Sequence, residues 1–537
     1  MPDLLEDPIV TESSFVLGGH ATQPQKAFLG ALKSALLQNH DLTEFSIRKK
    51  RPPFQGVITT NSINETPNTA GRPILFQHGN AGVVLQAGTH MYDVRGGTVT
   101  QLPTATFTAA TMYQLVEGNN KVYRLQGANG NIYSWDKNVA NAFTDAGSGN
   151  TNFPRAQCAL FASQNRMLAA NGPLGTSADF DSLYYSNSND PDTWDRTVQL
   201  FRVGIGDGDG IYGLIEIAQN VVLIGKGESF WEMDISNPNP SFWNARKIIK
   251  GFGISSAQHL CKYGTDVAML CGDGIYTLSS LRSGNPVPLT REVQDDFDAM
   301  VNRKSYSQNP AFSAAGHKNC AIAFDGTYLW MITTRTTTKY ALVLHVASGR
   351  WQRVTIDSSS SFDGRIYGIS ATGYSSVGTP RDVLTMIFVG STNYGDILVS
   401  PSYVTSGTGS GTAYGVFKDL DSLGNGYVIV SQEETGGLVF SAPSNNKNGE
   451  MLEVLWLGHT NGGSLLVEYQ LDESGSWTTL TTITLTGTAG VLNRSAMSLN
   501  GLAAFKTIRF RFTEQSNYLF QTLSWSAFAR VNNLELS

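Results

Sequence analysis

The sequence Ile275-Tyr276-Thr277-Leu278 is one copy of a phrase that recurs through most of this 537-residue chain. The phrase consists of an apolar residue, an aromatic residue, any residue and a second apolar residue. The other full copies are Met91-Tyr92-Asp93-Val94, Ile132-Tyr133-Ser134-Trp135, Phe230-Trp231-Glu232-Met233 and Ile366-Tyr367-Gly368-Ile369, and looser copies are Leu183-Tyr184-Tyr185 and Thr327-Tyr328-Leu329-Trp330. The aromatic residues are Tyr92, Tyr133, Tyr184, Trp231, Tyr276, Tyr328 and Tyr367. Their average spacing, (367 − 92)/6, is about 46 residues.

A repeat of this length indicates a β-propeller. Propeller blades recur every 40 to 50 residues or so, with four strands in each blade. Turn signals such as Asn129-Gly130, Asp273-Gly274 and Asp325-Gly326 lie beside the copies, and such pairs favour tight turns between antiparallel strands. A β-solenoid has shorter coils, and unrelated hairpins would leave open sheet edges. We therefore expect an all-β protein whose residues 58–400 form a propeller of six to eight blades, with seven favoured, and the seven aromatic residues in its core.

Two apolar runs indicate strands that are covered on both faces. They are Asn220 to Gly225 and Thr265 to Leu270, which are apolar at odd and at even positions alike. A strand with one solvent-exposed face alternates between apolar and polar residues, so these runs predict inner strands of a closed, layered structure.

Composition excludes several classes of protein. Charged residues make up 15% of the chain, against about 25% in an average soluble domain. The hydrophobic fraction of 41% is too high for a disordered chain, and the net charge of −6 argues against a generic basic nucleic-acid binder. No apolar run approaches the length of about 18 residues that would span a bilayer.

Residues 1–57 do not follow the repeat and are expected to form an N-terminal arm. Met1 to Ser14 lack the features of a secretory signal peptide, so we expect no secretion by that route. Gln25 to Asn39 carry apolar residues at helical spacing and predict a short helix. A basic cluster follows, made of Arg48, Lys49, Lys50 and Arg51. It is either a solvated turn or an assembly surface that docks on a neighbouring subunit or an acidic surface.

The C-terminal part has a different organisation. Residues 401–430 include the run Ser406 to Thr412, which alternates Ser, Gly and Thr and predicts a linker or loop. Residues 431–537 contain seven or eight segments with the alternation of half-buried strands, among them Met451 to Leu457 and Lys506 to Phe512. These predict a β-sandwich. A further short helix is expected at Val293 to Arg303.

Catalytic signals are scarce. The eight histidines show no metal-binding spacing, and neither a phosphate-binding loop nor a GxSxG elbow is present. The run Gly206-Asp207-Gly208-Asp209-Gly210 suggests calcium, but Ile211 and Tyr212 occupy the next two places, where an EF-hand loop has Asp or Asn and then Gly. We therefore expect no catalytic residue, no metal and no cofactor, and four buried free thiols, at Cys158, Cys261, Cys271 and Cys320.

Two segments resemble the Asp-box turn of sialidase-type propellers, although neither copy is complete. They are Ser186 to Trp194 and Asp472 to Trp477. Asp-boxes are structural turns, so this likeness supports β architecture alone. A propeller glycosidase would also need two convergent carboxylates, and no spacing in this sequence singles out such a pair.

An ordered series of phrases between Ser182 and Ser280 resembles one family. The phrases are Leu183-Tyr184-Tyr185-Ser186, Asp190-Pro191-Asp192-Thr193-Trp194, Gly208 to Leu214, Gly225-Lys226-Gly227-Glu228-Ser229-Phe230-Trp231, Gly251-Phe252-Gly253-Ile254-Ser255-Ser256 and Cys271-Gly272-Asp273-Gly274-Ile275-Tyr276. In this order they are similar to the propeller proteins at the tails of short-tailed bacteriophages, the tail nozzle, tail tubular or packaged-DNA stabilisation family. Asp41 to Glu44 and Arg51 to Phe54 resemble the arm of that family. The phrases are turns and strands, so no catalytic residue is carried over.

The resemblance implies a structural protein of the virion that is assembled in the host cytoplasm. It implies a ring of identical subunits, six in number, that retains packaged double-stranded DNA and conducts it during ejection without sequence specificity. Its other implied partners are a tail adaptor or portal-proximal protein and a tail fibre or spike. The alternative is a carbohydrate-binding or glycan-degrading propeller adhesin, and a third reading is an intracellular scaffold propeller.

Overall fold

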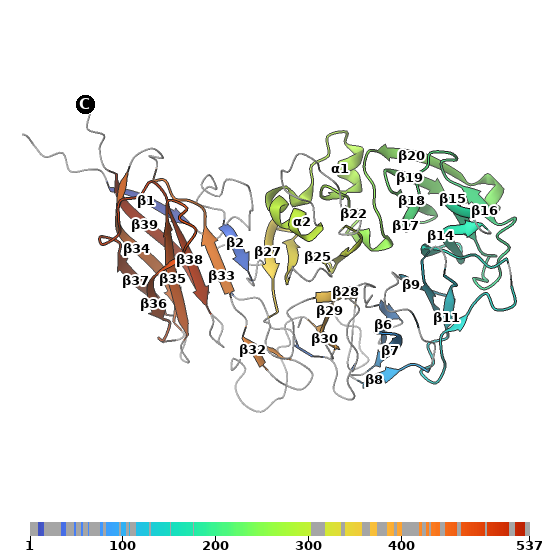
Figure 1. The fold of residues 1–537 in the computed structure, drawn as a ribbon, viewed down its shortest axis with the longest axis horizontal. Coiled ribbons are helices and arrows are strands. Elements are labelled where there is room, and N and C mark those ends of the chain that lie inside the picture. The colour runs from blue at the N-terminus through green and yellow to red at the C-terminus, as the bar shows by residue number, and fades with distance from the viewer. Residues whose placement is uncertain are drawn as a thin grey trace, which may run out of the picture.

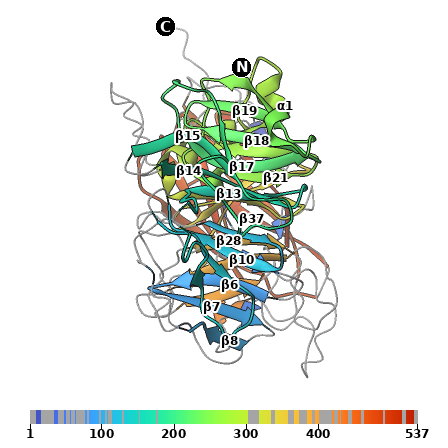
Figure 2. The ribbon, with the colours of Figure 1, turned by 90° about the vertical axis from the view of Figure 1, so that its right-hand side faces the viewer.

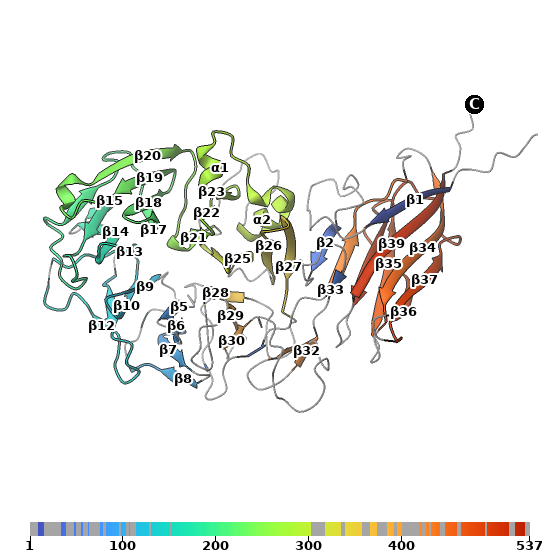
Figure 3. The ribbon, with the colours of Figure 1, turned by 180° about the vertical axis from the view of Figure 1, so that it is seen from behind.

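The computed structural model is built almost entirely from β-strands. It describes residues 9–14, 34–38, 48–49, 55–56, 63, 76–78, 82–95, 98–103, 107, 114–127, 130–150, 152–174, 177–301, 317–333, 339–356, 366–372, 384–390, 395–399, 418–420, 426–428, 431–440, 446–458, 463–488, 491–514 and 521–531. The strands form a ring of small antiparallel sheets with a two-layered module at its side (Figures 1 and 3).

Within the described residues the ring consists of seven sheets, which confirms the predicted β-propeller and the favoured number of blades. The first four sheets are β5 (Phe76–His78) to β8 (Thr98–Gln101), with β6 (Gly82–Ala87) and β7 (His90–Arg95); β9 (Gln114–Gly118), β10 (Lys121–Leu125), β11 (Tyr133–Trp135) and β12 (Thr144–Asp145); β13 (Cys158–Ala162), β14 (Arg166–Leu174), β15 (Ser177–Tyr185) and β16 (Leu200–Arg202); and β17 (Ile211–Ala218), β18 (Val221–Lys226), β19 (Ser229–Asp234) and β20 (Asn244–Lys250). The last three are β21 (Leu260–Tyr263), β22 (Asp266–Leu270) and β23 (Ile275–Thr277); β24 (Cys320–Phe324), β25 (Tyr328–Thr333), β26 (Ala341–His345) and β27 (Arg350–Val354); and β28 (Ile366–Thr372), β29 (Leu384–Gly390) and β30 (Gly395–Val399).

The first strands of the sheets line the inside of the ring. They contact one another in the order β9, β13, β17, β21, β24, β28 and β5, so the last sheet meets the first. Figure 2 views the ring from its rim, where successive sheets lie over one another from β18 through β13 and β10 to β6. Closing the ring in this way leaves only short edges exposed to solvent.

Apolar side chains fill the space between neighbouring sheets. Six hydrophobic clusters occupy the successive gaps from the first sheet to the seventh within the described residues. Strand β22 shows how one strand serves two gaps: Val267 and Met269 pack towards the fourth sheet, whereas Ala268 and Leu270 pack towards the sixth. Both faces of such a strand are buried, which explains the continuous apolar runs in the sequence.

Among the described residues, three short helical segments lie between the fifth and sixth sheets. Helix η4 (Leu289–Val293) leads into α2 (Gln294–Val301), which confirms the helix predicted at Val293 to Arg303. Phe297 and Met300 of α2 are fully buried in the cluster between these sheets. A shorter helix, α1 (Leu278–Arg282), follows β23 and contacts β22.

The C-terminal residues form the predicted β-sandwich. One layer contains β39 (Gln521–Val531), β34 (Lys447–Leu457) and β37 (Leu492–Ser498), and the other contains β33 (Ser431–Thr435), β38 (Ile508–Glu514), β35 (Ser464–Leu471) and β36 (Thr478–Thr484). The two layers enclose one apolar core that includes Leu452, Val467, Phe510 and Trp525.

The described strands of the N-terminal segment pair with strands of both the propeller and the sandwich. Strands β1 (Ile9–Ser14) and β3 (Arg48–Lys49) pair with β39 of the sandwich. Strand β2 (Ser34–Gln38) lies between β33 of the sandwich and β27 of the propeller. Strand β4 (Gln55–Gly56) pairs with β30 and supplies a fourth strand to the seventh sheet.

The helix predicted for Gln25 to Asn39 is wrong for Ser34–Gln38, which form strand β2; residues 25–33 lie outside the described residues. In β2, Leu36 pairs with Glu434 and Gln38 with Gln432 and Arg353. Pairing with β33 along the strand, and with β27 at Gln38, overrides the high helix propensity of Ala and Leu, because tertiary contacts outweigh intrinsic propensity.

The expected linker at 401–430 contains two short strands, β31 (Lys418–Leu420) and β32 (Gly426–Val428), which pair with each other. Strand β31 also pairs with β4, so these strands extend the seventh sheet. The run Ser406 to Thr412 lies outside the described residues.

Candidate functional site

Four of the six phrases that carry the family resemblance meet at one pocket of about 720 Å³. We call it the acidic pocket, because Asp207, Asp209, Glu228 and Asp273 line it while Lys318 is the one Lys or Arg among its lining residues. Phrases that are up to about 65 residues apart in sequence therefore lie at one place in the structure.

The acidic pocket lies on the face of the propeller where the first strand of each sheet begins. Its segments precede β17, follow β18, follow β20, follow β22 and precede β24. In an antiparallel sheet the start of the first strand and the end of the second lie at the same edge. We call this face the start face.

Asp209 ties two of the phrases together. Its side-chain oxygens accept hydrogen bonds from the backbone N–H groups of Gly227 (2.7 Å) and Glu228 (3.0 Å), and from the hydroxyl of Ser229 (3.1 Å). The phrase Gly251 to Ser256 packs on the same backbone. A Cβ atom at Gly253 would lie 1.9 Å from the carbonyl oxygen of Gly227. Glycine is therefore required at 253 by this close approach.

A buried lysine supports the floor of the pocket. The side chain of Lys226 is 0% exposed, and its Nζ donates to both carboxylate oxygens of Asp207 (2.7 and 2.8 Å) and to the carbonyl of Val203 (3.0 Å). Burial acts to raise the pKa of Asp207, but the hydrogen bonds from Lys226 and from the Asp209 N–H outweigh it, and the pKa lies below its usual value. The carboxyl group of Asp207 is thus held ionised.

His317 and Asp273 of the acidic pocket also have structural partners. His317 hydrogen-bonds through Nδ1 to the Ser255 hydroxyl (2.9 Å) and through Nε2 to the Leu270 carbonyl (3.0 Å). Asp273 accepts a hydrogen bond from the hydroxyl of Tyr276 (3.1 Å). Burial raises the pKa of the Cys271 thiol, which disfavours the nucleophilic thiolate.

This geometry does not assemble a metal site or an acid–base pair. The oxygens of Asp207 and Asp209 face nitrogen and hydroxyl donors rather than a common cavity. Among the described residues no group of three or more His, Cys, Asp or Glu side chains is placed to hold a metal ion. The lining of the pocket carries more carboxylates than cations, and such a surface repels phosphate groups.

The seven aromatic residues do not occupy equivalent places in their sheets. Five of them, Tyr92, Tyr133, Tyr184, Trp231 and Tyr276, lie on the third strand of successive sheets. Tyr328 lies on the second strand of the sixth sheet and Tyr367 on the first strand of the seventh. After Tyr276 the repeated aromatic residue therefore no longer falls on the third strand of its sheet.

The burial of these aromatic residues also differs. Tyr92, Tyr184 and Tyr276 are buried. Tyr133, Trp231 and Tyr328 are half-buried and pack against the clusters between sheets. The side chain of Tyr367 lies outside the described residues.

The basic cluster lies near the sandwich. Arg48 and Lys49 form β3, whose partners on β39 are Thr522 and Gln521. Lys50 and Arg51 lie outside the described residues. The assembly role of these four residues stays a prediction.

The Asp-box-like segment Ser186 to Trp194 joins two sheets, a role that the sequence did not reveal. Asp192 accepts hydrogen bonds from Lys121 (2.5 Å) and from the Tyr123 hydroxyl (2.9 Å) on β10 of the neighbouring sheet. Trp194 is buried against Phe153, with ring centroids 5.9 Å apart. The segment is a clasp between the second and third sheets.

No helix in the described part of the chain is long and apolar enough to cross a membrane. No protein-family model matches the sequence, and no curated protein matches it.

Solved structures with a similar arrangement include YCF48 bound to D1 peptide, with 9% identity, a TM-score of 0.28, and 37% of this chain and 62% of that chain covered. They include the extracellular domain of a putative one-component system from B. thetaiotaomicron, with 13% identity, a TM-score of 0.40, and coverage of 81% and 48%. A gluconolactonase from Xanthomonas campestris has 11% identity, a TM-score of 0.31, and coverage of 65% and 95%. This chain spans less than two thirds of the first two. Likeness at these scores says nothing about function.

Proposed function

We propose that this protein is a structural subunit of a phage tail, which forms a ring of six copies, retains packaged DNA and conducts it during ejection. The ring docks a tail adaptor and fibres or spikes. The proposal starts from the family resemblance of the phrases between Ser182 and Ser280. Where these phrases meet, Asp207, Asp209 and Asp273 accept hydrogen bonds from neighbouring structural groups.

The observation that carries the proposal is the way the N-terminal strands bind the two modules into one body. Strand β2 is hydrogen-bonded to the sandwich through β33 and to the propeller through β27. The side chain of Gln38 adds a hydrogen bond to the Thr355 hydroxyl (3.1 Å). A free-standing binding or catalytic module does not need such a connection, whereas a subunit that carries load in a tube requires a rigid one.

The negative net charge of the chain supports a role in which DNA passes through the ring without being bound tightly. Binding to DNA grows with the number of phosphates that Lys and Arg neutralise, and the net charge of this chain is −6. In the assembled ring we expect the loops that face the lumen to carry few Lys or Arg and more Asp, Ser, Thr and Asn. A continuous basic lining in an assembled structure would contradict this.

The test is the oligomeric state of the purified full-length chain. Light scattering should give a mass of six times 58.1 kDa, and negative-stain microscopy should show closed rings of fixed number. A gel-shift assay with duplex DNA at physiological salt should show no retention. A monomer or trimer that binds polysaccharide would favour the glycan-binding alternative, and a single disk without a ring would favour an intracellular scaffold.

A further inference from the structure

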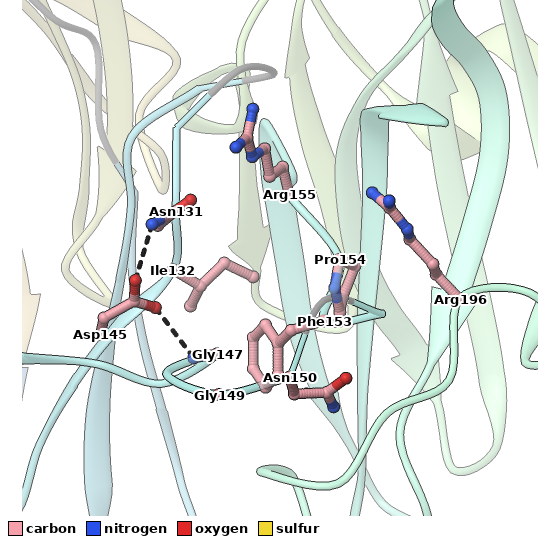
Figure 4. Close-up of a pocket in the computed structure, with 10 residues that line it drawn as sticks. All are labelled: Asn131, Ile132, Asp145, Gly147, Gly149, Asn150, Phe153, Pro154, Arg155 and Arg196. Atoms are coloured by element: carbon pink, nitrogen blue, oxygen red, sulfur yellow. Dashed lines mark hydrogen bonds between the residues drawn. The ribbon is translucent and has the colours of Figure 1, made fainter. Parts of the chain in front are cut away.

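A second pocket lies on the start face, between the second and third sheets, and has the opposite electrostatic character. We call it the arginine pocket. It has a volume of about 370 Å³, and its lining residues are Asn131, Ile132, Asp145, Gly147, Gly149, Asn150, Phe153, Pro154, Arg155 and Arg196 (Figure 4).

A hydrogen-bonded turn forms one wall of the arginine pocket. Asp145 at the end of β12 accepts from the Asn131 side-chain amide (2.6 Å) and from the Gly147 N–H (2.9 Å). Asn150 accepts from the Asn152 N–H (2.9 Å) and donates to the Trp194 carbonyl (3.0 Å). The wall is therefore held in shape before any ligand binds, which lowers the entropic cost of binding.

The two arginines enter the pocket from different segments. Arg155 is exposed and lies just before β13, whereas Arg196 is half-buried and belongs to the connection between β15 and β16. The backbone N–H of Arg196 donates to the Asn152 carbonyl (3.1 Å), which fixes that connection against the pocket. Figure 4 shows Arg196 extending from its own segment towards Pro154 and Arg155, with Asp145 on the opposite side of the pocket.

Neither guanidinium group has a hydrogen-bond or ion-pair partner among the described residues. Other exposed arginines of this chain do have one: Arg202 pairs with Asp181 (2.7 Å) and Arg246 with Glu232 (3.1 Å). The carboxylate in the arginine pocket, Asp145, already accepts hydrogen bonds on both oxygens. In a chain of net charge −6, two unpaired guanidinium groups at a preformed hollow are an available anion site.

We propose that the arginine pocket binds the carboxylate group of an acidic sugar unit. Guanidinium groups bind carboxylates through paired, charge-assisted hydrogen bonds. The volume of about 370 Å³ is in the range of small-ligand pockets and much exceeds the size of a bare phosphate ion. The Asn131 amide oxygen and the backbone of the turn at Gly149, where a Cβ atom would meet only open space, supply partners for sugar hydroxyls. This inference does not depend on the proposed function.

The test is isothermal titration calorimetry of the full-length chain with D-glucuronate, D-glucose, inorganic phosphate and a short DNA duplex. We expect glucuronate to bind and glucose not to bind. Arg155→Gln and Arg196→Gln should each weaken glucuronate binding at least about tenfold, the loss expected for one charged hydrogen-bonding partner. Arg246→Gln, a surface change on another sheet, should leave it unchanged.

Because neither guanidinium group makes a hydrogen bond or ion pair with the described residues, both variants should keep the wild-type circular dichroism spectrum and melting temperature. The proposal is overturned if glucuronate does not bind, if glucose binds as well, or if both arginine variants bind as the wild type does. Equal binding of phosphate, or arginine-dependent binding of the duplex, would overturn the sugar assignment in favour of a phosphate site.

Discussion

Replacing Lys226 by Met should destabilise the fourth sheet and its connection to the third sheet by about 3 kcal/mol. Removing one partner of a buried ion pair costs about 3–5 kcal/mol, because the other charge is left without compensation. Here Asp207 retains 20% exposure and a second cation, Lys247, at 3.9 Å, which reduces the cost. Loss of the hydrogen bond to the Val203 carbonyl adds about 1 kcal/mol or more.

Hydrogen exchange measured by mass spectrometry is the suitable assay, since a chain of several modules does not unfold in two states. Amide protons in peptides that cover β17 to β19 should exchange about a hundred times faster. A loss of about 3 kcal/mol corresponds to this factor, because each 1.4 kcal/mol changes an equilibrium constant tenfold. The matched control is Lys250→Met, which changes an exposed lysine of β20. Equal protection in Lys226→Met and wild type would refute the reasoning.

The same pair sets a pH dependence whose sign follows from Asp207. The folded-state pKa of Asp207 lies below that of the unfolded chain, which is about 3.9. The stability from the ion pair is therefore fully present above about pH 4 and is lost as the pH falls through the folded-state pKa. The difference between Lys226→Met and wild type should be large at pH 7 and should shrink on acidification below pH ~4.

Three further predictions concern other parts of the propeller. Asp192→Asn should weaken the clasp on Tyr123, reduce the stability of the second and third sheets by about 1–2 kcal/mol, and increase hydrogen exchange in β10 while leaving the sandwich unchanged. Asp325→Ala should destabilise the sixth sheet by about 2–3 kcal/mol, measured as increased hydrogen exchange in β24 and β25, because two backbone N–H groups and an indole N–H lose their acceptor. Burial raises the pKa of the thiols of Cys158 and Cys271, so neither should react with a thiol reagent at pH 8 until guanidinium chloride unfolds the chain.

The propeller was predictable because its signal is local and repeated. The strand over Thr265 to Leu270 and the strands of the sandwich show in the sequence as alternation or continuous burial, and no distant partner is needed to recognise them. The shift of the repeated aromatic residue to other strands at Tyr328 and Tyr367 was not predictable, since an aromatic residue packs between sheets equally well from the first, second or third strand. Spacing alone does not reveal which strand carries it.

The N-terminal strands and both pockets depend on contacts between distant residues. Ser34–Gln38 read as helix because their strand partners lie about 320 and 400 residues further along the chain. Arg155 and Arg196 carry no motif, and only the fold brings them to one hollow. The sequence shows that residue 253 is glycine. It does not show that the nearby backbone of Gly227 leaves no room for a side chain there.

The pairing of β1 with β39 has a consequence for biosynthesis. The ribosome makes Ile9–Ser14 about 500 residues before their partner strand, Gln521–Val531. At about 5–20 residues per second, translation of 537 residues keeps the earliest strand waiting for roughly half a minute or longer. The sheets of the ring can close in order during that time, whereas the layer of the sandwich that contains β39 is completed only after β39 has left the ribosome. Nascent chains that wait on one polysome with unpaired strands are exposed to exchange with their neighbours, so slower initiation or a bound chaperone should raise the yield of correctly folded subunits.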